Sequence, residues 1–178
     1  GCSISGVRGI LNGTTNYILT EMEAGKPYDD VLKTAQEMGY AEADPTGDVE
    51  GYDAMAKIMI LSNVVMGVEI TSEHVDREGI TGITEKMIND AKQKNSRWKL
   101  IGSVEKCNGE IRASVKPEII PMVHPLAGIM GATNALTFST DLLGDVTIVG
   151  AGSGKAETGF AILTDILSIN AFQMGNKS

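Results

Sequence analysis

The hydrophobic pattern of this chain changes near residue 97, and this change constrains the fold more than any other feature. Before this point, apolar residues recur with the 3.6-residue period of helices. Helices are predicted over residues 15–25, 29–39, 48–67 and 84–95, after a short strand at 4–11. The second half of the 48–67 segment is apolar nearly all round, which predicts a helix buried in the middle of a domain.

Beyond residue 97 the pattern is that of paired strands. Asn108-Gly109 is the strongest short-range signal for a β-hairpin, here over residues 98–120, and a second pair of strands is expected around Leu143-Gly144-Asp145. A last helix is predicted over residues 157–169. Because helices come first and paired strands come later, we predict the α+β class, with helices packed on a mixed or antiparallel sheet.

Composition excludes several classes of protein. The 178 residues include 15 Lys and Arg against 23 Asp and Glu, a formal net charge of −8. Nucleic acid is therefore not expected as the main partner, because phosphates need a basic face. No apolar run reaches the roughly 18–20 residues of a membrane span, and no signal peptide is visible. The two cysteines lack the spacing of metal ligands or of a redox pair, so we expect a reduced, cytoplasmic protein and assign no metal site.

Charged residues are concentrated between residues 42 and 57. The segment contains five carboxylates, followed by a single lysine: Glu42, Asp44, Asp48, Glu50, Asp53 and Lys57. Asp53 and Lys57 are one helical turn apart, so they share a face. A surface ion pair worth about 0.3–0.5 kcal/mol is the simplest interpretation. The apolar neighbours favour a different one, an inward-facing lysine that is partly desolvated and can act as a general acid.

The acids of the loop before this helix suit a ligand that carries an ammonium group. Glu42 and Asp48 are the candidates for binding that group, and Pro45 and Gly47 would fix the path of the loop. Together with a lysine acid, these residues predict a small, amino-acid-like ligand with a reactive oxygen. For Asp44 and Glu50, two interpretations stay open: a part in the site, or solvated loop charges.

Two long motifs resemble the substrate-binding and catalytic region of the homoserine dehydrogenase family. They are GILNGTTNYIL at residues 9–19 and AQEMGYAEADPTGDVEGYDAMAK at residues 35–57. A weaker similarity extends to GAGSGKAETGFAILTDI at residues 150–166. The resemblance implies an oxidoreductase that uses NADP or NAD to interconvert L-homoserine and L-aspartate 4-semialdehyde, in the biosynthesis of threonine, methionine and isoleucine.

The resemblance also implies roles for individual residues. Lys57 matches the lysine proposed to give a proton to the aldehyde oxygen, and Asp53 matches its acidic partner. The positions that match substrate-binding residues are Thr14, Tyr40, Glu42 and Asp48. Cofactor contact is implied for the glycine-rich turn and the helix that follows it, at Gly150, Gly152, Gly154, Glu157 and Thr158.

The turn GAGSGK at residues 150–155 fits neither common nucleotide-binding signature. A P-loop would need a glycine at Val149 and a hydroxyl residue at Ala156, and G-x-G-x-x-G would need a glycine at Lys155. Its glycines could still let a helix N-terminus come close to a cofactor or an anion. The alternative is a plain turn between a strand and a helix.

The family's βαβ nucleotide-binding unit, with its G-x-G-x-x-G motif, has no counterpart before Gly1 in this sequence. We therefore expect residues 1–149 to form a substrate-binding, catalytic and dimerisation domain, and residues 150–178 to return to a missing nucleotide-binding domain. The chain alone is expected to be inactive and cut from a longer protein. The edges of the predicted hairpins, like the resemblance, favour a homodimer. A catalytically silent dimerisation or regulatory module with the same fold is the alternative.

Overall fold

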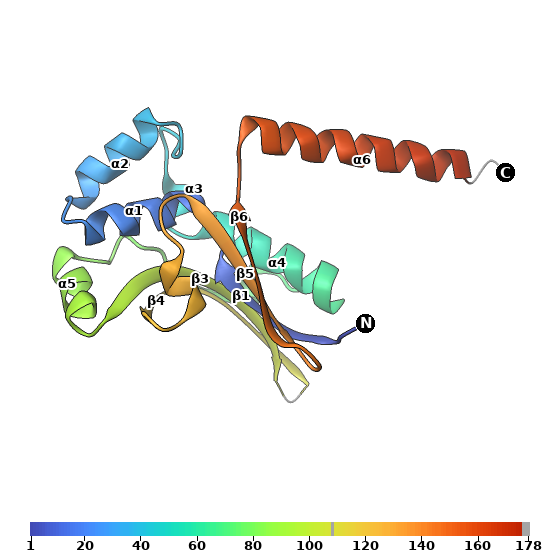
Figure 1. Ribbon diagram of the computed structural model, residues 1–178, viewed down its shortest axis with the longest axis horizontal. Helices are drawn as coiled ribbons and strands as arrows, with labels where there is room; N and C mark the ends of the chain where they lie inside the picture. Colours follow the sequence, from blue (N-terminus) through green and yellow to red (C-terminus); the bar gives the residue numbers. More distant parts are fainter. Residues whose placement is uncertain (108, 176–178) are drawn as a thin grey trace.

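A computed structural model describes residues 1–107 and 109–175, and within them the chain forms a sheet of six strands together with several helices (Figure 1). The strands are β1 (Ile4–Ile10), β2 (Val75–Arg77), β3 (Ser96–Cys107), β4 (Glu110–Pro121), β5 (Thr133–Thr140) and β6 (Gly144–Ala151). The helices are α1 (Gly13–Glu23), α2 (Tyr28–Glu37), α3 (Thr46–Val49), α4 (Tyr52–Met66), α5 (Glu85–Gln93) and α6 (Lys155–Gly175), with the short 3-10 helices η1 (Ser72–His74) and η2 (Pro125–Gly128). The predicted α+β class is confirmed.

The strand order is β2-β4-β3-β1-β5-β6, so the first strand of the chain lies in the interior of the sheet. β1 pairs antiparallel with both β3 and β5, and only β2 joins its neighbour, β4, in parallel. Both predicted hairpins exist, as β3–β4 and β5–β6. In the first, Asn108 lies outside the described residues. In the second, Gly144 already belongs to β6, so the turn falls at residues 141–143, earlier than predicted.

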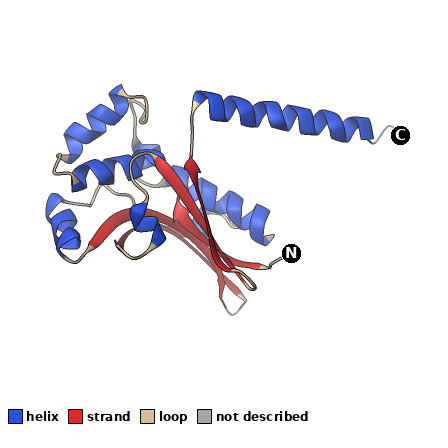
Figure 2. Cartoon of the chain, viewed as in Figure 1, coloured by secondary structure: helices blue, strands red, loops and turns tan. Residues whose placement is uncertain are grey.

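The helices α1, α4 and α5 pack on the sheet and form the main core with it (Figure 2). Fully buried residues of this core include Val7, Ile18, Ile58, Val104 and Val115. A smaller cluster, formed by Ile10, Ile101, Ile120, Leu126 and Ala127, joins η2 to the strands. Because α1 starts directly after β1 and α4 packs on β1 and β3, the N-termini of both helices are held close to the end of β1.

The single helix predicted over residues 48–67 is wrong, because Gly51 divides it into α3 and α4. Gly51 has a φ of +80°, in the left-handed region that side chains avoid. A Cβ at this position would also lie 3.1 Å from Cγ1 of Val115, on the neighbouring strand β4. The change of direction at Gly51 places Asp48, at the end of α3, and Asp53, at the start of α4, around the same point.

We expect the substitution Gly51→Ala to lower the free energy of unfolding by about 1–2 kcal/mol, the cost of a left-handed residue with a Cβ. Gly47→Ala is the matched control, because a Cβ there meets nothing within 4 Å and its φ is not positive. Denaturant unfolding of both variants measures the difference. Equal stabilities for the two variants would contradict the assigned role of Gly51.

The second half of the 48–67 helix was also predicted to be buried in the middle of a domain, and this is wrong for the described residues. One face of α4, with Ala54, Ile58 and Ser62, packs on the sheet, whereas Ile60 and Val64 are 60% and 76% exposed.

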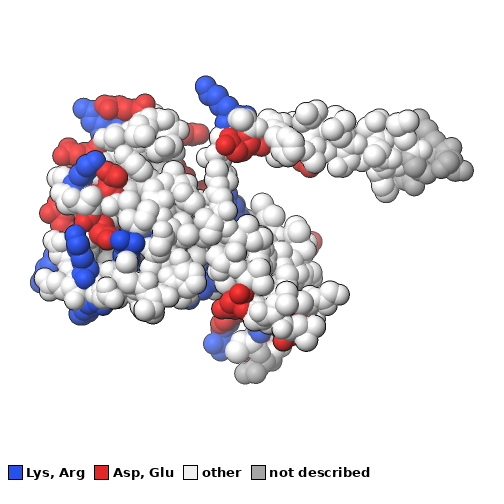
Figure 3. Space-filling view, viewed as in Figure 1, with Lys and Arg blue, Asp and Glu red and all other residues white. Residues whose placement is uncertain are grey.

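The apolar residues of α6 are exposed as well, and this helix projects away from the body (Figure 1). Charged residues gather instead around the end that carries α2 and α5 (Figure 3). In residues 1–107 and 109–175, no helix is both long and apolar enough to cross a membrane.

Candidate functional site

A small polar cavity of about 210 Å³ lies where the N-terminus of α1, the α3–α4 turn and the segments beside β5 and β6 meet. Its lining residues are Asn12, Gly13, Thr14, Gly39, Tyr40, Asp48, Asp53, Lys57, Ala132, Asn134, Gly152 and Ser153. Cavities for drug-sized ligands usually exceed roughly 300 Å³. This cavity therefore suits a ligand of the size of one amino acid.

Lys57 and Asp53 form the ion pair that their spacing predicts. Nζ of Lys57 lies 2.6 Å from Oδ2 of Asp53 and also donates to the carbonyl of Leu11, at 2.9 Å. The two side chains are 40% and 37% exposed, so both are open to the cavity. An ammonium group has three N–H donors. With two of them engaged by protein oxygens, the third can face a ligand oxygen.

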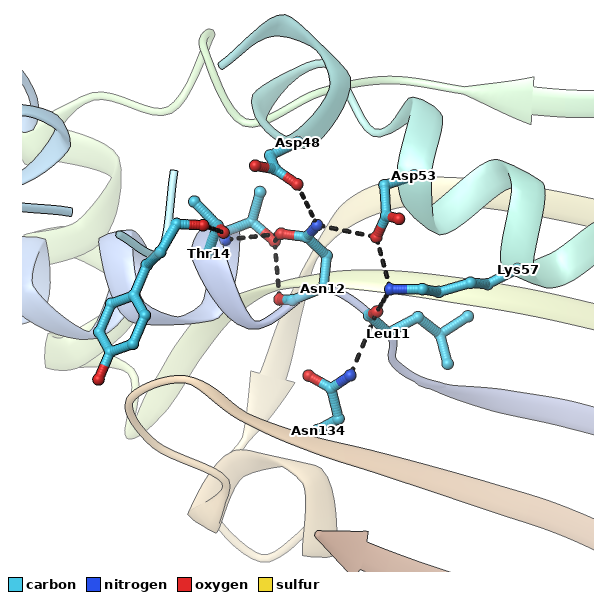
Figure 4. A network of polar contacts seen from close by, with 9 residues as sticks. Leu11, Asn12, Thr14, Asp48, Asp53, Lys57 and Asn134 are labelled. Carbon is cyan, nitrogen blue, oxygen red and sulfur yellow. Dashed lines mark hydrogen bonds and ion pairs between the residues drawn. The ribbon is translucent and has the colours of Figure 1, made fainter. Parts of the chain in front are cut away.

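Asn12 connects the two carboxylates, and it is a residue that the sequence analysis missed. Its Nδ2 donates to Oδ1 of Asp48, at 2.6 Å, and to Oδ2 of Asp53, at 2.9 Å (Figure 4). Its Oδ1 accepts the backbone N–H of Thr15 at 2.8 Å and so caps α1. The helix predicted from residue 15 therefore begins at Gly13, with Asn12 as its N-cap. The signal for Asn12 was present in the sequence, because Asn is among the preferred N-cap residues.

The predicted substrate-binding residues divide into two groups. Thr14, Tyr40 and Asp48 line the cavity together. The hydroxyl of Thr14 donates to the carbonyl of Tyr40 at 2.7 Å, and the Tyr40 ring packs edge-on against Tyr17. Glu42, by contrast, is exposed and is not among the residues that line the cavity. Its role at the substrate therefore stays a prediction.

Asp44 and Glu50 make local contacts in the loop region and do not line this cavity. The carboxylate of Asp44 accepts the N–H of Thr46 at 3.1 Å, and hydrogen bonding from Thr46 lowers the pKa of Asp44. Glu50 accepts the hydroxyl of Thr81 at 2.8 Å. Each acid thus helps to shape the loops around the cavity.

The glycine-rich turn reaches the cavity with its central residues only. Gly152 and Ser153 line it, and a Cβ at Gly152 would lie 2.0 Å from Nδ2 of Asn134. Gly150 pairs with Asn134 inside the sheet. Farther along, Gly154 starts the first turn of α6 by accepting the N–H of Thr158 at 2.9 Å, and Glu157 and Thr158 are exposed. The five predicted cofactor contacts are therefore not gathered at one point in this structure.

Asn134 is a second cavity residue that the sequence analysis missed. Its Nδ2 donates to the carbonyl of Leu11 at 3.3 Å, the same oxygen that accepts from Lys57 (Figure 4). Its Oδ1 is buried and has no hydrogen-bond donor within the described part of the chain. A buried acceptor of this kind fits a ligand that brings an N–H group.

Lys99 lies in the predicted hairpin of residues 98–120 and was not singled out from the sequence, yet it is 1% exposed. Its Nζ donates to Oδ1 of Asn16 at 2.8 Å and to the carbonyl of Ile129 at 2.5 Å. The pKa of Lys99 is lowered to about 8, mainly by burial and also by the nearby charge of Arg97, against a smaller opposing effect of Glu23. A strand pattern cannot reveal a buried lysine, because the acceptors come from segments distant in sequence.

The lowered pKa of Lys99 sets a dependence of stability on pH. In the unfolded chain the pKa of this lysine is near 10.5, so between pH 8 and 10.5 the unfolded state holds more protons than the folded state. The free energy of unfolding contributed by Lys99 therefore rises with pH in this window, by at most about 1.4 kcal/mol per pH unit. We expect wild type to gain stability relative to Lys99→Met from pH 8 to 10. Parallel denaturant titrations test this, and a constant difference would contradict it.

Comparison with known proteins gives one consistent family. The family model for homoserine dehydrogenase matches residues 1–167. An NAD(+)-dependent homoserine dehydrogenase from Pseudomonas canavaninivorans is 47% identical over 171 residues, which are 96% of this chain and 49% of that protein. The homoserine dehydrogenase of Methanocaldococcus jannaschii is 44% identical over 170 residues, covering 95% and 49%.

Solved structures agree with these relatives. A homoserine dehydrogenase from Thiobacillus denitrificans superposes with a TM-score of 0.93 at 38% identity, covering 98% of this chain and 41% of that one. The Staphylococcus aureus enzyme at pH 6.5 gives a TM-score of 0.90 at 40% identity, covering 95% and 43%. The chain thus spans about half the length of the relatives that it matches.

Proposed function

Because the chain belongs to the homoserine dehydrogenase family, we propose that it is the substrate-binding and catalytic part of an enzyme that interconverts L-homoserine and L-aspartate 4-semialdehyde. The observation that best supports this is the Lys57–Asp53 pair, held open to a cavity of amino-acid size. The reaction changes a carbonyl oxygen into a hydroxyl. A cation that can supply a proton at that oxygen is the group such a reaction needs.

Each residue around the cavity has a distinct proposed task. Lys57 donates a hydrogen bond and then a proton to the aldehyde oxygen, and Asp53 holds its Nζ in place. Asp48, fixed by Asn12, faces the cavity with a negative charge that suits the ammonium group of the amino acid. Thr14 holds Tyr40 at the rim through its hydrogen bond to the Tyr40 carbonyl.

The residues beside the cavity also fit a nicotinamide cofactor, NAD or NADP. The buried Oδ1 of Asn134 offers an acceptor, and Gly152 leaves the backbone close to it without a side chain. When bound, this group would supply the hydride for the carbonyl carbon. One relative is named for its dependence on NAD(+), and a hyperthermophilic archaeal homoserine dehydrogenase mutant with a TM-score of 0.76 at 34% identity was solved in complex with NADPH.

The rest of the proposal concerns the whole protein. We place it in the cytoplasm, on the biosynthetic route to threonine, methionine and isoleucine, as a homodimer. The exposed apolar residues of the edge strand β6, Ile148 and Val149, support an assembly with a second copy. The exposed apolar residues of α6, such as Phe160 and Leu163, support a nucleotide-binding domain that covers this helix.

The test is an assay of the complete protein that contains this chain, with L-homoserine and either NAD⁺ or NADP⁺, following the nicotinamide absorbance. Turnover that depends on homoserine, with much lower rates for L-serine and L-threonine, is the expected result. A folded complete protein that reduces neither cofactor with homoserine would overturn the proposal. It would favour the catalytically silent module instead.

A further inference from the structure

The segment of residues 129–134 forms the side of the cavity opposite the α3–α4 turn. Its residues 129–132 have no regular secondary structure, and Thr133 and Asn134 begin β5. Ala132 and Asn134 line the cavity. The segment passes so close to the start of α1 that a Cβ on Gly13 would lie 2.6 Å from the carbonyl oxygen of Ala132. A shift of this segment would therefore change the shape of the cavity directly.

One buried side chain of α1, Asn16, gathers the backbone of the segment. Its Nδ2 lies within hydrogen-bond distance of the carbonyl oxygens of Gly131, at 2.8 Å, and of Ile129 and Thr133, each at 3.2 Å. A single amide cannot satisfy three carbonyls fully, because it has two N–H donors. Asn16 needs its own oxygen to be fixed in order to keep this orientation.

Lys99 provides that fixed point. Its ammonium group donates to Oδ1 of Asn16 at 2.8 Å and directly to the carbonyl of Ile129 at 2.5 Å, and it lies 3.8 Å from the sulfur of Met130. Asn16 lies one helical turn after Asn12, which holds Asp48 and Asp53. A buried cation on β3 thus connects α1, whose N-cap Asn12 holds the cavity's acids, to the segment that closes the cavity's other side.

From this arrangement we infer that Lys99 is a positioning residue for substrate binding: it holds the 129–134 segment, and so the shape of the substrate cavity, without touching the substrate. The expected change in the KM for homoserine rests on the proposed function. The structural part of the inference, the anchoring of the segment, is independent of the reaction.

The experiment compares Lys99→Met with wild type in the complete protein. Methionine keeps much of the stem length and removes all three donors. Lys106→Met, an exposed lysine on the same strand β3, is the matched control. Hydrogen exchange of the 129–134 amides, followed by mass spectrometry, reports the anchoring. Steady-state kinetics report the cavity, through kcat and the KM for homoserine.

We expect exchange in the 129–134 segment to become at least about tenfold faster in Lys99→Met, with α2 unchanged, because hydrogen bonds from a charged group are lost. The KM for homoserine should rise about tenfold, while kcat stays within about threefold. Asn16→Ala should have the same effect, and the double variant should be no worse than either single variant. Where Lys99→Met does not fold, Asn16→Ala decides the result alone, because it removes the other side chain of the same contact.

Unchanged exchange in the segment would overturn the inference, and so would faster exchange without any change in the KM for homoserine. A fall in kcat as large as the rise in the KM for homoserine would mean a general structural role rather than control of the substrate cavity, and would also overturn it. If the wild-type protein does not act on homoserine, the proposed function fails. The exchange result would then still decide whether Lys99 anchors the segment.

Discussion

Replacing Lys57 by methionine should lower the kcat of the complete protein by roughly 10²–10⁴, the range expected when a general acid is lost. The Nζ of Lys57 is the cavity's cationic donor, held by Asp53 at 2.6 Å and by the carbonyl of Leu11 at 2.9 Å. Methionine has a similar length but no proton to give.

The control for this prediction is Lys33→Met, which removes an exposed lysine from α2, away from the cavity. Circular dichroism and the oligomeric state should be the same for both variants. Steady-state kinetics in both directions of the reaction give the result. If Lys57→Met keeps activity within about threefold of wild type, Lys57 is not the acid. For a pair as exposed as this one, a structural ion pair of less than about 1 kcal/mol would then be the better description.

Asp53→Asn separates the two roles within the pair. It removes the charge that faces Lys57 but keeps a polar side chain of the same size. A loss in kcat that is smaller than that of Lys57→Met would agree with an orienting role for Asp53. A larger loss would mean that Asp53 itself takes part in proton transfer.

The parts of this site that were predictable from the sequence are those set by local geometry. The spacing of Asp53 and Lys57 places them one helical turn apart, and the structure shows this pair. Gly25 and Gly39, which were expected to end the first two helices, do follow α1 and α2 with a positive φ. In each case the interacting groups are within a few residues of one another, so the helix period alone fixes them.

The missed parts depend on contacts between distant segments. Asn12 meets Asp48 and Asp53 across 36 and 41 residues, and Lys99 meets Asn16 across 83. A hydrophobic period in the sequence predicts none of these three long-range contacts. The interior place of β1 was hidden for the same reason, because its partners β3 and β5 come about 90 or more residues later. The break at Gly51 was missed because an apolar pattern on both sides of one glycine indicates a continuous helix.

Substitutions of Asn12 should give the second large effect on activity, and the order of kcat/KM of two variants tests its role. Asn12→Ala removes the cap of α1, which should cost about 1 kcal/mol of stability. It also leaves Asp48 and Asp53 without their shared donor, although the space opened by a small residue lets water replace it. We expect this variant to lose about tenfold in kcat/KM for homoserine.

Asn12→Asp keeps the cap, because aspartate accepts the Thr15 N–H as well as asparagine does. It nevertheless replaces a donor by a third carboxylate within hydrogen-bond distance of Asp48 and Asp53, where like charges repel strongly. We therefore expect the better-capped variant to be the poorer enzyme, with a loss of about 10²–10³ in kcat/KM. Kinetics of both variants decide the matter: an Asp variant as active as the Ala variant would mean that Asn12 serves only as the cap of α1.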